Sequence, residues 1–221
     1  MNPADAISAA RSRLSVPADF NHDELRHLAD LFLESCDKYA DEPMVTSLGN
    51  TLTYAQVREG AEQFASFLQH HTRLKPGDRV ALQMPNVTQY QIAFYGTLMA
   101  GMVVVNTNPL YTPKELKHQF NDSGAKLLVV LENVAHTVAE VLPETGIEQV
   151  VITQVADMHA LLSRTLTHFV VKRIKKMVPA YSIANSLSWR DSLKLGSQQS
   201  YQAPAIALDD LAMLQYTGGT T

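Results

Sequence analysis

The chain has 221 residues, and a chain of this length buries about 70% of the surface that its unfolded form exposes, so a substantial core is expected. Charged residues make up 18% of the sequence, hydrophobic residues 46%, and the net charge is -4, which is ordinary for a globular protein and argues against nucleic acid as the main partner. No signal-peptide pattern opens the sequence, no run approaches the ~18 apolar residues of a membrane span, and the single cysteine excludes an intrachain disulfide and a cysteine-based zinc site.

Residues 1–74 contain the pattern of helices around a hairpin. Residues 24–39 carry apolar side chains at helical spacing, and Cys36 falls on that apolar face, which predicts a buried, unreactive thiol. Gly49 and Asn50 form a turn signal between two short strands. Thr53 and Gln56 have the spacing of a capping box, so a second helix is expected to start there.

Residues 75–153 alternate apolar strands with helices. The run from Val87 to Ala100 is apolar on nearly every side, and we expect Asn86 and Gln89 to cap it. A second box, formed by Thr112 and Glu115 with Pro113 between them, starts the next helix. The expected strands are 79–84, 102–108, 125–131 and 148–153, and a short helix covers 133–142.

Continuous apolar strands with helices between them predict an α/β fold, a largely parallel sheet flanked by helices. Ligands of such sheets bind outside the carboxyl ends of the strands. The sequence reaches that position at its far end, where an apolar strand is followed by Thr217.

Residues 154–208 show a weaker pattern, a basic amphipathic segment followed by a loop. On a helix over 168–179, the apolar side chains gather on one side and the basic side chains lie elsewhere. The apolar set is Val170, Ile174, Met177 and Val178; the basic set is Lys172, Arg173, Lys175 and Lys176. Such a helix either lies on an anionic membrane surface or is a surface helix with solvated lysines.

Residues 209–221 lead from a strand into the glycine–threonine stretch, the strongest chemical signal of the chain. Glycine lets backbone amides turn around a phosphate, and threonine hydroxyls add donors. The alternative is a tight turn that binds no ligand. The candidate binding residues are Thr217, Gly218, Gly219, Thr220 and Thr221. Neither of the two usual nucleotide motifs, GxxxxGK[ST] or GxGxxG after a strand, occurs, and no GxSxG elbow of serine hydrolases is present.

Three separated stretches resemble, in order, the first three core motifs of the adenylate-forming enzymes. These are LTYAQV (52–57), LMAGMVVVNTNPLYTPKEL (98–116) and LQYTGGTT (214–221). That superfamily comprises the acyl-CoA synthetases, firefly luciferase and the adenylation domains of peptide synthetases. KPGDRVALQMPN (75–86) and FVVKRIKKMVP (169–179) are similar to the bacterial long-chain fatty-acyl-CoA synthetases. The resemblance extends over about 25–221.

The resemblance implies a ligase that uses ATP, Mg²⁺ and coenzyme A. A long-chain fatty acid would form an acyl-adenylate with release of pyrophosphate, and coenzyme A would then displace AMP. Thr217 to Thr221 would hold the β- and γ-phosphates of ATP. In relatives, the magnesium-binding glutamate, the adenine contacts and the catalytic lysine follow this loop, so no catalytic or metal residue is assigned here. The chain would then be the N-terminal portion of the large domain, and inactive alone.

The sequence leaves two other hypotheses of function open. One keeps the family but changes the substrate to an aryl, medium-chain or amino acid. The other is a non-catalytic α/β module that docks on membrane lipid. We expect a cytoplasmic protein, with peripheral contact to the inner face of the membrane as a further expectation. An incomplete α/β domain leaves strands and apolar helix faces without neighbours, so we expect either a homodimer or a poorly ordered C-terminal tail.

Overall fold

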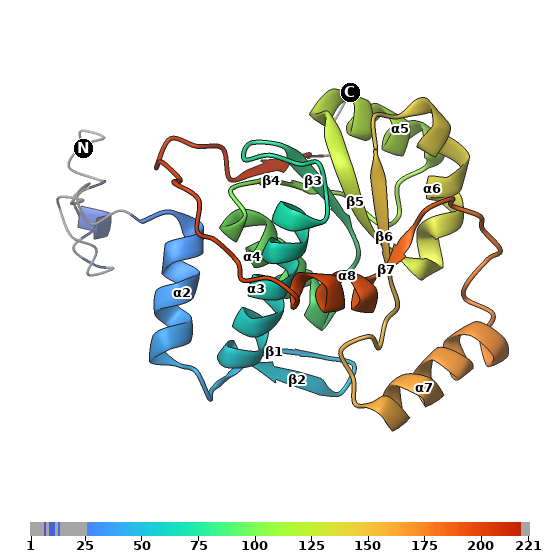
Figure 1. The fold of residues 1–221 in the computed structure, drawn as a ribbon, viewed down its shortest axis with the longest axis horizontal. Helices are drawn as coiled ribbons and strands as arrows, with labels where there is room; N and C mark the ends of the chain where they lie inside the picture. The colour runs from blue at the N-terminus through green and yellow to red at the C-terminus, as the bar shows by residue number, and fades with distance from the viewer. Residues whose placement is uncertain (1–6, 8, 12, 14–25, 218–221) are drawn as a thin grey trace.

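The computed structural model describes residues 7, 9–11, 13 and 26–217, and its centre is a six-stranded parallel sheet (Figure 1). The sheet order is β7-β6-β5-β3-β4-β8, and every neighbouring pair is parallel. Its strands are β3 (Arg79–Gln83), β4 (Val103–Asn106), β5 (Ala125–Leu131), β6 (Gln149–Thr153), β7 (Leu187–Ser188) and β8 (Met213–Gln215). A separate antiparallel hairpin pairs β1 (Pro43–Ser47) with β2 (Asn50–Thr53). The prediction of an α/β fold with a parallel sheet is confirmed.

Helices cover both faces of the sheet, because β3 and β4 bury side chains on each side. One core contains residues of α2, α3, α4 and α8; the other contains residues of α5 and α6. The α-helices are α2 (Leu28–Lys38), α3 (Tyr54–His70), α4 (Thr88–Met99), α5 (Pro113–Ser123), α6 (Ala135–Val141), α7 (Leu161–Phe169) and α8 (Trp189–Gly196). The short turns are 3₁₀ helices η2 (Glu132–Val134) and η3 (Leu142–Glu144) and the π-helical η4 (Val170–Ile174).

Both predicted capping boxes are confirmed. The Thr53 hydroxyl accepts from the Gln56 backbone N–H, and the Gln56 side chain accepts from the Thr53 N–H, which starts α3. Thr112 and Glu115 make the same exchange at the start of α5, with Pro113 as the first helical residue. Gly124 ends α5 with a φ of 64°, the left-handed conformation that glycine adopts without steric cost.

The predicted cap of α4 is wrong. Val87 occupies the cap position and makes no side-chain hydrogen bond, and Asn86 lies outside the helix. Gln89 is fully buried instead, and its amide donates to Thr153 Oγ1 at 2.9 Å and to the Gln154 carbonyl at 2.8 Å. A polar group that is out of contact with water needs hydrogen-bond partners. The end of β6 supplies them to the buried Gln89 amide, which therefore does not cap the helix.

The segment 154–208 contains more structure than its sequence pattern predicts. It supplies β7, at one edge of the sheet, and α8, which packs on α3. Trp189 is fully buried, with its ring centroid 5.0 Å from that of Phe64. At Gly196 the two helices approach so closely that an added Cβ would overlap the Gln63 backbone carbonyl. The helix α8 has only eight residues, and Trp189 is its one large buried side chain, so its sequence gives a weak helix signal.

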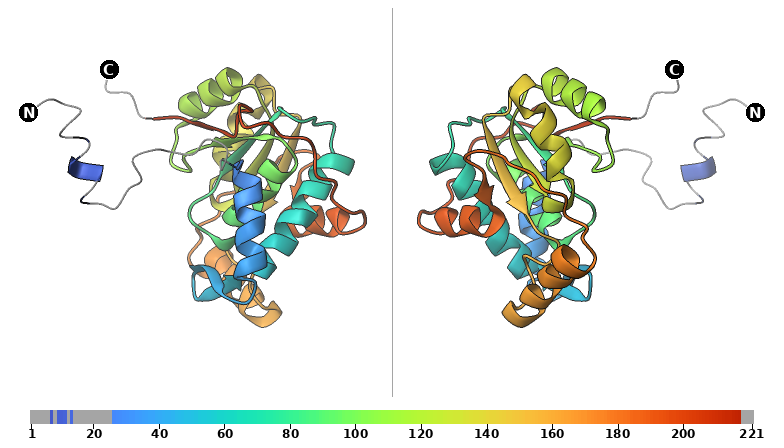
Figure 2. Two further views of the ribbon diagram at one scale, coloured as in Figure 1. Left: turned by 90° about the vertical axis from the view of Figure 1, so that its left-hand side faces the viewer. Right: turned by 90° about the vertical axis from the view of Figure 1, so that its right-hand side faces the viewer.

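The basic helix predicted over 168–179 is displaced toward the N-terminus. The structure has α7 from Leu161, continued by the π turn to Ile174, and Lys176 has a left-handed φ of 49° that ends the helical path. Figures 1 and 2 show α7, in orange, at the end of the molecule away from α5. Among the described helices, none is long and apolar enough to cross a membrane.

Candidate functional site

A crevice opens between the carboxyl ends of β3 and β4. The chain leaves β3 for α4, in one core, and leaves β4 for α5, in the other. Neighbouring parallel strands whose connections diverge in this way form the usual ligand crevice of an open α/β sheet. A cavity of about 520 Å³ lies there. It is lined by residues that follow β3, by Tyr90 of α4, by the segment from Asn106 to Tyr111, and by Gln215 and Tyr216 at the end of β8.

Asn106 is the hydrogen-bonding centre of the crevice. Its side-chain oxygen accepts from the Tyr90 hydroxyl at 2.7 Å, and its side-chain amide donates to Gln215 Oε1 at 2.8 Å. The Gln119 amide donates to its backbone carbonyl, also at 2.8 Å. One residue therefore ties α4, α5 and β8 to the end of β4. Burial raises the pKa of Tyr90, so this hydroxyl keeps its proton and acts as donor.

Two buried amides beside the crevice have unmet hydrogen-bonding capacity. Gln83, the last residue of β3, is fully buried, and neither its oxygen nor its nitrogen has a partner among the described residues. Gln119 Oε1 lacks one as well. Buried polar atoms without partners cost free energy. Polar groups with unused hydrogen-bonding capacity therefore lie near the carboxyl ends of β3 and β4.

The end of β8 is fastened at two points. Gln215 is bonded to Asn106, and the Tyr216 hydroxyl donates to Asp122 Oδ2 of α5. Burial, followed by this bond to a carboxylate, raises the pKa of Tyr216 to about 12. Thr217 follows directly and is exposed. Of the predicted loop residues the structure places only Thr217; Gly218, Gly219, Thr220 and Thr221 lie outside the described residues.

The described crevice residues do not form a ligand set for a divalent cation. They offer amides and hydroxyls, and the nearby carboxylate of Asp122 is bonded to Tyr216. In the described parts of the chain, no group of three or more His, Cys, Asp and Glu side chains is placed to hold a metal ion. We therefore assign no step to a protein-bound metal in this part of the chain.

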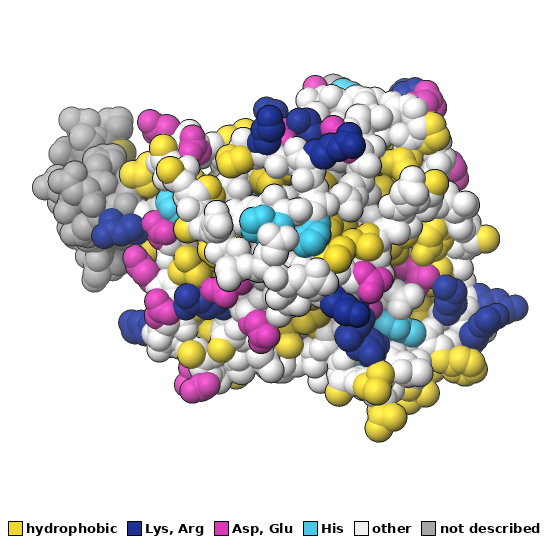
Figure 3. All heavy atoms as spheres, viewed as in Figure 1, with side chains coloured by type: hydrophobic (Ala, Val, Ile, Leu, Met, Phe, Trp, Pro, Cys, Tyr) yellow, Lys and Arg dark blue, Asp and Glu magenta, His cyan; other side chains and the backbone are white. Residues whose placement is uncertain are grey.

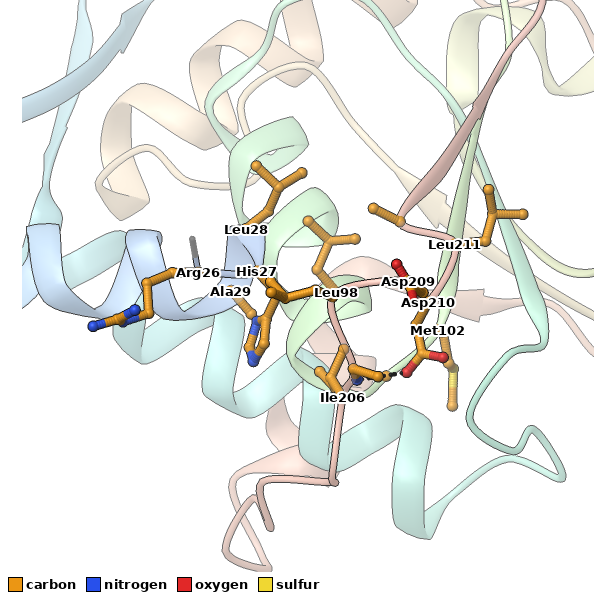
Figure 4. A pocket seen from close by; sticks show the side chains of 14 residues that line it. Arg26, His27, Leu28, Ala29, Leu98, Met102, Ile206, Asp209, Asp210 and Leu211 are labelled. Atoms are coloured by element: carbon orange, nitrogen blue, oxygen red, sulfur yellow. Dashed lines mark hydrogen bonds between the residues drawn. The ribbon is translucent and has the colours of Figure 1, made fainter. Parts of the chain in front are cut away.

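A second cavity, of about 510 Å³, lies at the amino ends of β4 and β8, opposite the carboxyl ends that form the crevice (Figure 4). Leu98 and Met102, before β4, and the segment 206–212, before β8, form much of its wall. The carboxylate of Asp210 is occupied by the Ala207 backbone N–H at 2.8 Å. The cavity is largely apolar and lies at the amino ends of the strands, away from the predicted loop, so we assign it no chemistry.

Comparison with known proteins decides the family. The model of the family "AMP-binding enzyme" matches residues 32–221. The chain belongs to this family. It is 46% identical over 206 residues to a long-chain-fatty-acid--CoA ligase of Escherichia coli O157:H7, which covers 93% of this chain and 37% of that protein. A ligase of the same name from Bacillus subtilis is 31% identical over 195 residues, which is 88% of this chain and 34% of its own.

Solved structures share the fold. The anthranilate CoA ligase AuaEII, in complex with anthranoyl-AMP, superposes with a TM-score of 0.72 at 18% identity, over 91% of this chain and 35% of that one. A long-chain-fatty-acid-CoA ligase from Archaeoglobus fulgidus gives a TM-score of 0.64 at 24% identity, over 88% and 35%. The chain thus spans little more than a third of the length of each of these four proteins.

Sequence reasoning missed the residues that build the crevice. Tyr90 belongs to a helix whose sequence is apolar on nearly every side, and Asn106 directly follows a short run of valines. The available signal was the position of Asn106, a polar residue at the carboxyl end of a buried strand, where the sites of α/β sheets are built. Its partners, Tyr90 and Gln215, are brought to it only by tertiary packing.

Proposed function

We propose that the protein to which this chain belongs is an ATP-dependent long-chain fatty acid:CoA ligase that works through an acyl-adenylate. The 46% identity to a ligase of that name carries the proposal. The crevice supports it, because β8 delivers Thr217 to the carboxyl edge of the sheet. The alternative, a ligase for an aryl acid, is supported by a structure at only 18% identity and is the weaker candidate.

The reaction has two steps. The fatty carboxylate attacks the α-phosphorus of ATP, and the bond to pyrophosphate breaks, giving acyl-AMP. The thiol of coenzyme A then attacks the acyl carbon and AMP leaves with the electron pair of the acyl–oxygen bond. In the first step the protein must orient the phosphates and offset their charge. We propose that Thr217 and residues 218–221 do this through backbone N–H groups and hydroxyls.

Asn106 and Asp122 position this loop. Asn106 is bonded to Gln215, the last residue of β8, and Asp122 is bonded to Tyr216, which directly precedes Thr217. ATP enters as its magnesium complex, so the metal arrives with the substrate. The crevice offers neutral donors at this point. The positive charge that offsets the phosphates is therefore supplied by groups other than the described crevice residues.

The test is fatty-acid-dependent exchange of labelled pyrophosphate into ATP by the full-length protein, which reports the adenylation step without coenzyme A. Thr217→Ala should lower exchange by about 10- to 100-fold, the equivalent of one hydrogen bond to a charged group. Thr51→Ala, an exposed threonine on the β1–β2 hairpin, is the control and should leave exchange unchanged. Exchange that does not need the acid, or that is unaffected by Thr217→Ala, would contradict the proposal.

We further propose a cytoplasmic enzyme that touches the anionic inner face of the membrane reversibly. Long-chain fatty acids partition into bilayers, so an enzyme that collects them there gains from a basic contact. The exposed basic residues Arg173, Lys175 and Lys176 support this contact.

We also propose that the 221-residue chain by itself forms a homodimer along β8. This strand is at the end of the sheet order and, among the described residues, pairs only with β4, so its other edge offers unpaired backbone groups. Light scattering on the isolated chain should give twice the monomer mass. A monomer at every concentration would contradict this association.

A further inference from the structure

We infer that the outer face of α7 is the element that inserts into an anionic lipid surface. We call Leu162, Leu166 and Phe169 the α7 face. The inference deepens the proposed membrane contact and rests on that part of the proposed function. It does not depend on which acid the enzyme activates.

The α7 face is an exposed apolar stripe. Leu162 is 85% exposed, Leu166 65% and Phe169 56%. Their spacing of four and then three residues places them on one side of a helix. No residue of α7 is buried. Figure 3 shows hydrophobic side chains gathered over this helix, at the lower right of the view, with Lys and Arg side chains beside them.

Polar contacts of α7 and of the segment that follows it attach this part of the chain to the body. Lys172 donates to Glu132 Oε1 at 2.9 Å, and the Glu132 side chain is itself nearly buried at the end of β5. His168, half-buried, lies with Nε2 3.9 Å from Asp157 Oδ1. The Asn133 amide donates to the Met177 carbonyl at 3.0 Å. With this part attached to the body, the leucines point to solvent.

Charge decides which occupant fits the α7 face. From Met158 to Arg190 the sequence has six Lys and Arg and no Asp or Glu, in a chain whose net charge is -4. Arg173, Lys175 and Lys176 are exposed, and none of them forms an ion pair with another described residue. A second copy docked on this face would bring like charges together, whereas an anionic bilayer complements them. Apolar side chains flanked by basic ones are the pattern of a helix that lies in a membrane interface.

This face differs from the one that the sequence predicts. The residues expected to dock included Val170 and Val178, and both are partly buried against the body. Ile174 and Met177 are exposed, at 64% and 53%, and continue the surface beyond α7. The inserted side chains therefore come from α7 itself. The basic residues Arg173, Lys175 and Lys176 follow its C-terminal end.

The test is co-sedimentation of the 221-residue chain with vesicles of phosphatidylcholine alone or mixed with phosphatidylglycerol. We expect binding to the mixed vesicles, weakened at least tenfold by Leu162→Ser. Leu208→Ser is the matched control, because Leu208 is 56% exposed on the loop before β8, on a different surface, and it should bind as the unchanged chain does. Arg173→Gln with Lys175→Gln and Lys176→Gln should abolish the preference for the anionic vesicles.

Three results would overturn the inference. They are equal binding to neutral and anionic vesicles, equal loss in Leu162→Ser and Leu208→Ser, and a dimer in solution that Leu162→Ser converts to a monomer, which would assign the face to a second copy. Pyrophosphate exchange, measured on the same full-length variants with detergent-dispersed fatty acid, separates the two proposals. A protein that exchanges but does not bind vesicles refutes only the docking face, and one that binds vesicles without exchange refutes only the ligase.

Discussion

The side chain of Asn106 joins the end of β4 to α4 and β8, while Gln119 holds its carbonyl. We predict that Asn106→Ala lowers the free energy of unfolding by about 1–3 kcal/mol, because Tyr90 loses its partner at a partly buried position and the exposed Gln215 loses its tie to β4. Asn121→Ala is the control: its amide reaches a backbone carbonyl on the exposed surface, and its loss should cost about 0.5 kcal/mol or less. Urea unfolding of both variants measures this. Equal effects would show that Asn106 is no more than a surface amide.

Cys36 tests burial at the residue scale. It is 2% exposed, and burial raises the pKa of its thiol to about 11, so the reactive thiolate is scarce at neutral pH. The native chain should resist a thiol reagent at mildly alkaline pH and react fully in denaturant. Rapid reaction of the native chain would mean that α2 detaches from the body.

The contact between α3 and α8 depends on a glycine. A Cβ at Gly196 would overlap the Gln63 carbonyl, and backbone cannot move aside as a flexible side chain does. We predict that Gly196→Ala lowers the free energy of unfolding by about 2–4 kcal/mol. Gly146→Ala is its control, since nothing lies within 4 Å of the added atom there. A neutral Gly196→Ala would mean that the two helices are spaced further apart in solution.

The free energy of unfolding should depend on pH through His168 of α7. Desolvation lowers the pKa of His168 below its ordinary 6.5, although Asp157 and then Glu132 act in the opposite direction and Arg164 and His159 add to the lowering. Because the unfolded chain then binds more protons, stability should fall as pH drops through this range. Burial also raises the pKa of Asp157, which works the other way at lower pH. In denaturant unfolding across pH, His168→Gln should flatten the fall near 6.5; an unchanged slope would contradict this origin.

At the element scale, the sequence was sufficient wherever a local signal agreed with the packing. The boxes at Thr53 and Thr112 and the valine-rich strands are determined by neighbouring residues, and they were predicted. The cap of α4, the helix α8 and the start of α7 were not. Gln89 follows its tertiary partners on β6, Trp189 is buried by α3, and α7 exposes its leucines against the usual rule. Each depends on contacts between segments far apart in the chain.

At the scale of the whole molecule, phosphate binding by residues 217–221 stays a prediction, but the position of Thr217 just after an apolar strand was predictable from the sequence. The crevice beside it was not, because Tyr90, Asn106 and Gln215 come from three elements. Parallel pairing of β4 with β3 and β8 brings these elements to one edge. The fold therefore places Thr217 beside a crevice that the sequence alone does not reveal.

The central claim is that this crevice belongs to an enzyme that activates long-chain fatty acids with ATP. The most direct measurement is AMP release by the full-length protein with ATP and magnesium, with and without oleate and coenzyme A, and with benzoate or an amino acid in place of oleate. We predict release that requires both oleate and coenzyme A, and none from the 221-residue chain alone. Turnover with benzoate or an amino acid but not with oleate would contradict the choice of substrate, and no acid-dependent release at all would contradict the ligase.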